Sequence, residues 1–177
     1  MRLGKKILGL FAGIMCLGAL ASCNKGGSET TPTKEEPVIE KVYVSHSCGD
    51  NESPEWKEYT LENLNTCKLT NTKLIGGGIV ISFQAKKELK VKSISVSFNN
   101  ILNSENITNV SATSRIYTSK DSHGSFFNDY TSQQHISLKE DTKISLNDTV
   151  EQGKYYNFLI YKGGEWSNIS IDYEEVK

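Results

Sequence analysis

The chain contains few histidines, prolines and arginines, and it lacks the short motifs of the commonest catalytic sites. Three histidines and three prolines occur among its 177 residues. No Gly-x-Ser-x-Gly turn and no His-Glu-x-x-His pair is present, and the glycine run 76–78 lacks the Lys-Ser or Lys-Thr of a phosphate-binding loop. We therefore identify no catalytic residue from these motifs.

One histidine does lie beside a serine and an aspartate, in the stretch Asp121, Ser122 and His123. A Ser-His-Asp triad is assembled in space from residues that are apart in the sequence. Three consecutive side chains rarely point toward one place, so this stretch favours a polar loop over a hydrolase site.

The shortage of positive charge excludes a further class of function. Beyond the first 22 residues Arg115 is the only arginine, and residues 23–177 carry a net charge of 17 − 21 = −4. The sequence has no basic cluster, which argues against the binding of nucleic acid.

The first 22 residues have the pattern of a secretory signal peptide. Arg2, Lys5 and Lys6 precede an apolar run over residues 7–20 that no charged residue interrupts. The run is about 14 residues long, whereas a membrane-spanning helix needs roughly 20. Because small residues end the run, we assign residues 1–22 to a signal peptide and leave them out of the fold.

The end of this segment, Leu20-Ala21-Ser22-Cys23, resembles the lipobox of bacterial lipoprotein precursors. The resemblance implies a diacylglyceryl group on the Cys23 thiol, cleavage just before Cys23, and a fatty acyl group such as palmitate on the new amino terminus. Two or more acyl chains hold a protein stably at a membrane. Asn24, in place of an aspartate, implies the outer membrane if the cell has two membranes. The alternatives are a secreted protein with an incidental cysteine and an uncleaved anchor.

A polar segment separates this cysteine from the rest of the chain. Residues 24–37 contain no large apolar side chain and are rich in Gly, Ser, Thr, Glu and Pro. Such a segment cannot bury enough surface to offset the entropy of ordering it. We therefore predict a lipidated flexible tether over residues 23–37 and one folded domain over residues 38–177.

The domain alternates between apolar and polar residues with a period of two, which predicts half-buried β-strands. The parity of the third run shifts at Lys92 and Ser93, which predicts a β-bulge or bend. Many short alternating runs in one domain predict an all-β fold, an antiparallel two-sheet β-sandwich of jelly-roll or immunoglobulin-like type with about eight strands. The eight runs are 41–45, 78–83, 88–98, 109–119, 135–138, 143–146, 154–161 and 168–176.

One segment departs from this alternation. Ser53 suits a helix N-cap and Pro54 the first helical position, although Tyr59 and Leu61 still alternate. We predict a short helical turn or an irregular loop here.

Two cysteines, Cys48 and Cys67, remain in the exported domain, and we predict a disulfide between them. Closing a loop of about 20 residues stabilises a fold by about 3 kcal/mol in the chain-entropy model. The alternative is a metal site at His46, Cys48 and Asp50, although the sequence offers no second cluster of ligands.

No cofactor is predicted, but two oxygen-rich stretches leave a structural calcium ion as an alternative. They are residues 50–53 and 139–143, and neither has the ligand spacing of an EF-hand.

Aromatic side chains are the candidates for ligand binding. Trp56 and Trp166 lie beside turns and among polar neighbours, with Tyr59 and Tyr161 near them in sequence. An exposed aromatic ring offers a flat apolar face on which a sugar ring stacks. For each tryptophan the alternative is packing in the core or at a sheet edge.

Three short stretches resemble known domains. Residues 153–176 resemble the last hairpin of galactose-binding-like jelly rolls, and residues 54–61 resemble the Trp-x-x-Tyr-Thr strand of some carbohydrate-binding modules. The Gly153-Lys154 strand start is similar to that of fimbrillin-like lipoprotein domains. Because these stretches cover about a fifth of the chain, no binding residue is transferred from them.

These features together predict a lipid-anchored protein of the cell envelope. We expect its β-sandwich to bind a glycan or another envelope protein without catalysing a reaction, with the membrane reached through the lipid on Cys23. The alternative is an envelope glycan-processing enzyme with an irregular active site.

Overall fold

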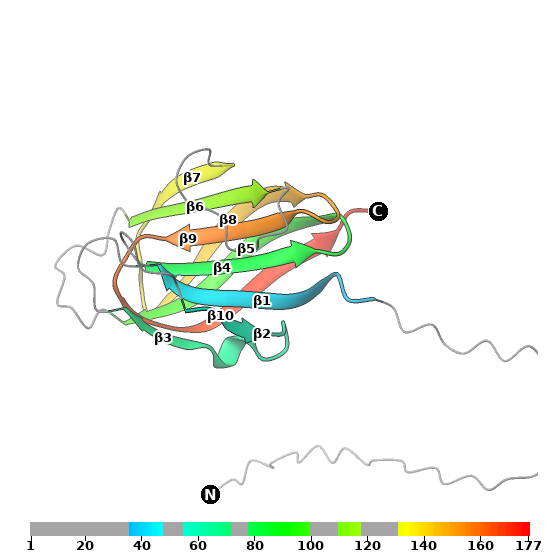
Figure 1. The fold of residues 1–177 in the computed structure, drawn as a ribbon. Helices are drawn as coiled ribbons and strands as arrows, with labels where there is room; N and C mark the ends of the chain where they lie inside the picture. Colours follow the sequence, from blue (N-terminus) through cyan, green and yellow to red (C-terminus); the bar gives the residue numbers. More distant parts are fainter. Residues whose placement is uncertain (1–35, 48–54, 72–77, 100–109, 118–130) are drawn as a thin grey trace, which may run out of the picture. The chain divides into compact units, whose positions relative to one another are not determined.

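Two antiparallel β-sheets packed face to face form the fold in a computed structural model of the chain (Figure 1). The structure describes residues 36–47, 55–71, 78–99, 110–117 and 131–177, all within the compact unit Glu35–Lys177. Residues 1–22, predicted to be a signal peptide, and Cys23 lie outside the described residues. None of the helices in the described part is long and apolar enough to cross a membrane.

The described part of the chain contains ten strands. One sheet has the strand order β2-β1-β4-β9-β6-β7, and the other has the order β3-β10-β5-β8. The prediction of an all-β, antiparallel, two-sheet sandwich is therefore confirmed. The elements are β1 (Ile39–Ser47), β2 (Lys57–Tyr59), the 3-10 turn η1 (Leu64–Thr66), β3 (Lys68–Asn71), β4 (Gly78–Ala85), β5 (Leu89–Asn99), β6 (Val110–Tyr117), β7 (Ser132–Ile136), β8 (Asp141–Val150), β9 (Tyr155–Ile160) and β10 (Gly164–Glu175).

The apolar residues that alternate along the strands form the core between the sheets. Val42 and Val44 of β1 face Ile81 and Phe83 of β4 in the ladder, and all four side chains are fully buried. Each of the eight predicted runs corresponds to an observed strand, because a period of two in the sequence puts one face of each strand against the other sheet.

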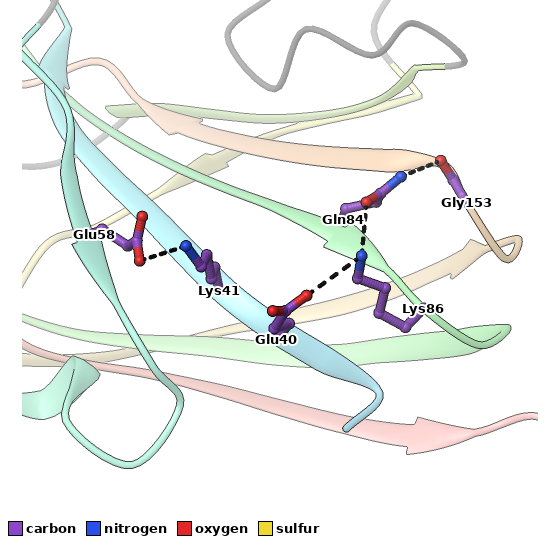
Figure 2. A network of polar contacts seen from close by, with 6 residues as sticks. All are labelled: Glu40, Lys41, Glu58, Gln84, Lys86 and Gly153. Carbon is purple, nitrogen blue, oxygen red and sulfur yellow. Dashed lines mark hydrogen bonds and ion pairs between the residues drawn. The ribbon is translucent and has the colours of Figure 1, made fainter. Parts of the chain in front are cut away.

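The segment 55–64 does not form the predicted helical turn or loop throughout, and the predicted N-cap Ser53 and Pro54 lie outside the described residues. Lys57–Tyr59 forms strand β2 instead, which pairs with Val42–Val44 of β1. The ladder brings Glu58 beside Lys41, and their side chains form an ion pair of 2.8 Å (Figure 2). Strand β3 was also missed, since a strand of three or four residues is too short to show a period.

The predicted irregularity at Lys92 and Ser93 is confirmed. Ser93 pairs with Asp172 and Val91 with Tyr173, so Lys92 is an extra residue opposite β10. The pairing of β5 with β8 also shifts register between Val91 and Ser93. This β-bulge keeps both apolar halves of β5 on the inner face despite the change of parity.

One end of the sandwich holds both the start of β1 and the end of β10, and we name it the terminal end (Figure 1). Strand β4 also ends there and β5 begins, joined by residues 86–88. Lys86 Nζ lies 3.4 Å from Glu40 Oε2 and donates to Gln84 Oε1 at 3.3 Å, while Gln84 Nε2 donates to the Gly153 carbonyl at 3.1 Å (Figure 2). These contacts join β1, β4 and the turn between β8 and β9.

A buried hydrogen bond joins the two sheets inside the core. Tyr156 of β9 donates from its hydroxyl to Asp148 Oδ2 of β8 at 2.8 Å, and its ring packs against Phe83. Burial, followed by the nearby Asp148 carboxylate, raises the pKa of Tyr156 far above its usual range, so this hydroxyl stays a donor. Asp148 is 7% exposed and depends on such a donor.

We predict that Tyr156→Phe lowers the free energy of unfolding by about 1–3 kcal/mol, because Asp148 then loses its donor inside the core. Urea unfolding of the lipid-free mature chain measures the change. Tyr155→Phe is the matched control, since Tyr155 is half-buried on the opposite face of the same strand. Equal stability of the two variants would contradict the role of this hydrogen bond.

Candidate functional site

A polar groove lies on the outer face of the four-stranded sheet, at the end of the sandwich opposite the terminal end. Its volume is about 600 Å³, and a second hollow of about 290 Å³ shares Ser97, Asp141 and Asn168 with it. The groove is lined by Ser97, Phe98, Asn99, Glu140, Asp141, Glu165, Ser167 and Asn168. Ser95, Val96, Thr142 and Lys143 complete the second hollow.

Three strands supply this lining because of their pairing. Ser97 of β5 lies opposite Asp141 of β8 on one side and opposite Ser167 of β10 on the other. Val96 and Phe98 point inward and are buried, so Ser95, Ser97 and Asn99 point outward by alternation. The end of β5 and the beginnings of β8 and β10 therefore present their polar side chains together.

A hydrogen-bonded ladder crosses these three strands. Asn168 Nδ2 donates to Ser97 Oγ at 3.1 Å, and Ser97 Oγ donates to Asp141 Oδ1 at 2.7 Å. Residues 44 and 71 positions apart in the sequence are thus held side by side. The ladder fixes the rotamers of all three side chains on the groove floor.

A β-bulge in β10 places Asn168 in this ladder. Ser167 pairs with Ser97, and Ser170 with Ser95, so β10 has one residue more than β5 over this interval. Asn168 takes a φ of +50°, a left-handed conformation that asparagine tolerates better than most residues. The bulge turns the Asn168 amide toward β5.

An aromatic pair lies beneath the groove. The rings of Phe98 and Trp166 have centroids 4.6 Å apart and are tilted by 50°. A Cβ added at Gly164 would lie 2.3 Å from the Phe98 ring, so only glycine lets β10 begin this close to β5. This packing holds the two strands that carry Ser97 and Asn168.

Three carboxylates surround the groove. Glu140 and Asp141 are exposed and Glu165 is half-buried. Within the described ranges no ion pair joins any of the three, whereas Lys143 Nζ lies 3.7 Å from Asp172. Uncompensated carboxylates accept hydrogen bonds and attract cationic or hydroxyl-bearing groups.

The described residues contain no group of three or more His, Cys, Asp or Glu side chains placed to hold a metal ion. Of the oxygen-rich stretches considered for calcium, residues 139–143 border the groove, and residues 50–53 lie outside the described part. Asp50 of the alternative metal site and the stretch from Asp121 to His123 are also outside it.

The structure corrects the prediction for Trp166. Its side chain is fully buried and offers no ring face to a ligand. Its polar neighbours Glu165 and Ser167 had suggested exposure. On a strand, however, alternate side chains point to opposite faces, so two outward neighbours turn Trp166 into the core.

The other three aromatic candidates lie away from the groove lining. Trp56 and Tyr161 are half-buried, outside the bounds of any strand. Tyr59 lies on β2, where its ring packs against the core cluster. The structure therefore does not bring these aromatic residues together with the groove.

Cys67 has a buried free thiol, and its predicted partner Cys48 lies outside the described residues. Tyr59 forms a side-chain hydrogen bond with Cys67, and burial together with this bond raises the pKa of Tyr59 to about 12. Burial also raises the pKa of the Cys67 thiol, while Tyr59 and Lys57 oppose that shift. A thiol held protonated reacts slowly as a nucleophile.

The sequence did not predict Ser97, Glu165 and Asn168 as site residues. One signal for Asn168 was present, since the odd spacing from Trp166 to Ile169 places both inward only if β10 contains a bulge. The meeting of β5, β8 and β10 had no such signal, because strand order cannot be deduced from the periods.

Comparisons with known proteins add no family to this description. None of the protein-family models searched matches the chain, and none of the curated proteins matches it.

Proposed function

We propose that this chain is a lipid-anchored protein of the cell envelope whose β-sandwich binds a glycan without catalysing a reaction. The observation that carries the proposal is the groove on the outer face of β5, β8 and β10, lined by hydroxyl, amide and carboxylate groups. Sugar hydroxyls are recognised by such groups in well-placed sets.

The position of the groove supports a display role. The chain begins β1 at the terminal end, and β5 leads from there to the groove over roughly 25 Å, at about 3.3 Å for each residue from Leu89 to Ser97. A domain attached through the tether of residues 23–37 would thus carry the groove at the end away from its attachment.

The polarity of the surface favours a glycan over a protein partner. Among the described residues Val176, 45% exposed, is the one large hydrophobic side chain that is exposed. The centre of a protein interface is usually formed by aromatic and apolar side chains. The described surface offers no such centre, whereas the groove offers hydrogen-bonding groups.

A glycan-processing enzyme is the second candidate, favoured by the three carboxylates of one groove. Glycoside hydrolysis uses two carboxyl groups, one of which is an acid kept protonated by an apolar surrounding. Glu140 and Asp141 are instead exposed to water, so the arrangement suits binding better.

The first prediction of this proposal concerns the anchor. Expressed in a bacterium that processes lipoproteins, the wild-type chain should lack residues 1–22 and partition into the detergent phase. Cys23→Ala should remove both the lipid and this cleavage, because its thiol is the acceptor. Mass spectrometry of the amino-terminal peptide reads the result, and a Cys23→Ala protein that is cleaved and membrane-held as before would refute the assignment.

A second prediction concerns Cys48 and Cys67. In protein isolated from the oxidising envelope, we expect a disulfide between them, detected by non-reducing peptide mapping. Such a bond would tie the end of β1 to the start of β3. Two free thiols in that protein would rule the bond out, and the buried Cys67 thiol should then react with a thiol reagent far more slowly in the folded chain than in urea.

A third prediction places the binding in the groove. On a glycan array, the lipid-free mature chain should bind at least one glycan, and Asp141→Ala and Glu165→Ala should each weaken that binding about tenfold, the equivalent of one charge-assisted hydrogen bond. The matched control is Glu174→Ala, an exposed acid at the far end of β10.

Three other results would change the assignment. If Trp56→Ala lost binding while the groove variants bound as strongly as the wild type, the binding site would be assigned to the aromatic residues. Shortening of the bound glycan over time would favour the enzyme, and binding of no glycan would overturn the proposal.

A further inference from the structure

We infer that the groove selects glycans by the polarity of their hydrogen bonds, taking neutral or amino sugars and rejecting acidic ones. This inference rests on the proposed glycan binding and names the ligand class of the same groove. Asn168 and Asp141 are the residues that set the selection.

The direction of the ladder follows from the proton inventory of its members. An ionised carboxylate only accepts, so Ser97 must donate its single hydroxyl proton to Asp141. The Ser97 oxygen is then left as an acceptor, and the atom of Asn168 that reaches it at 3.1 Å must be the amide nitrogen. The donors and acceptors of these side chains therefore allow one direction of donation, from Asn168 through Ser97 to Asp141.

This order decides what the floor of the groove offers to a ligand. The ladder engages one of the two amide hydrogens of Asn168 and one carboxylate oxygen of Asp141, and the acceptors Asn168 Oδ1 and Asp141 Oδ2 take part in none of its bonds. The neighbouring Thr142 hydroxyl is also engaged, because it donates to the Lys139 carbonyl. A ligand that donates through hydroxyl or ammonium groups therefore matches these two acceptors and the carboxylates of Glu140 and Glu165.

The charges around the groove act in the same direction. The two hollows have a net charge of −3 + 1 = −2, from three carboxylates and one ammonium group. These belong to Glu140, Asp141, Glu165 and Lys143. The carboxylate of an acidic sugar would meet this net negative charge, and Lys143, the cation of the second hollow, already lies 3.7 Å from Asp172. An ammonium group would be attracted, and a neutral sugar would be accepted through its hydroxyls.

The test compares three hexamers of glucosamine that share one backbone and differ at nitrogen: free amino groups, N-acetyl groups and N-succinyl groups. Calorimetry measures their binding to the lipid-free mature chain. We expect the amino and N-acetyl hexamers to bind, and the N-succinyl hexamer to bind at least tenfold more weakly than the N-acetyl hexamer.

Two variants separate selection from folding. Asp141→Asn replaces an acceptor by an amide of the same shape, so the disadvantage of the N-succinyl hexamer should fall to less than threefold. Asn168→Gly keeps the left-handed backbone. It should weaken the binding of the N-acetyl hexamer several-fold without changing the midpoint of thermal unfolding. Glu174→Gln, outside the groove, should leave the selectivity unchanged.

The outcomes distinguish this inference from the proposed function. N-succinyl binding as strong as N-acetyl binding, or selectivity unchanged in Asp141→Asn, would overturn the inference while leaving glycan binding intact. Binding of none of the three hexamers would also overturn it, and the glycan array then decides the proposed function separately.

Discussion

The packing of the two sheets against each other decides the direction of every side chain in the sandwich. Each strand must turn one face toward the core, so a residue and its neighbour in the sequence point opposite ways. Phe83 of β4 and Phe158 of β9 are fully buried for this reason, and Trp166 is buried although its neighbours are polar. The same constraint leaves Ser97 and Glu165 on the outer face, where the groove forms.

The bulges in β5 and β10 each have a visible consequence, and a further register shift lies between Ile39 and Val42 of β1. At Lys92 the extra residue restores the inward direction of the apolar side chains in the second half of β5. At Asn168 the extra residue turns an amide toward the neighbouring strand, where it bonds Ser97. One bulge thus serves the core and the other shapes the polar floor.

The sequence predicted the layers of this fold better than its site. Period-two runs gave the strands, their inner residues and the Lys92 bulge, because these depend on neighbouring residues alone. Strands β2 and β3 are too short to show a period, and β2 is recognised through its pairing with β1. The groove depends on β5 lying between β8 and β10, an arrangement decided by contacts between residues far apart in the chain.

The sheet edges have features that oppose unwanted pairing. Strands β2 and β3, at two of the edges, have three and four residues. Strand β8 is a long edge strand, but Gln134 of β7 donates to the Ser145 carbonyl at 3.2 Å, which occupies one backbone acceptor of this strand. Short edge strands and an occupied acceptor both oppose the addition of another strand at these three edges.

Some buried polar atoms differ from the polar side chains of the groove in their hydrogen bonding. Both amide atoms of Asn157 and the indole nitrogen of Trp166 are buried and have no hydrogen-bond partner among the described residues. The Asn168 and Asp141 side chains are exposed yet bonded, so their polarity adds little to stability and is available to a ligand. Phe98, Gly164 and Trp166 hold the strands from below, while Asn168, Ser97 and Asp141 face outward. Since the supporting and the ligand-facing side chains are different residues, substitutions on the groove floor can change binding without removing the packing that forms the groove.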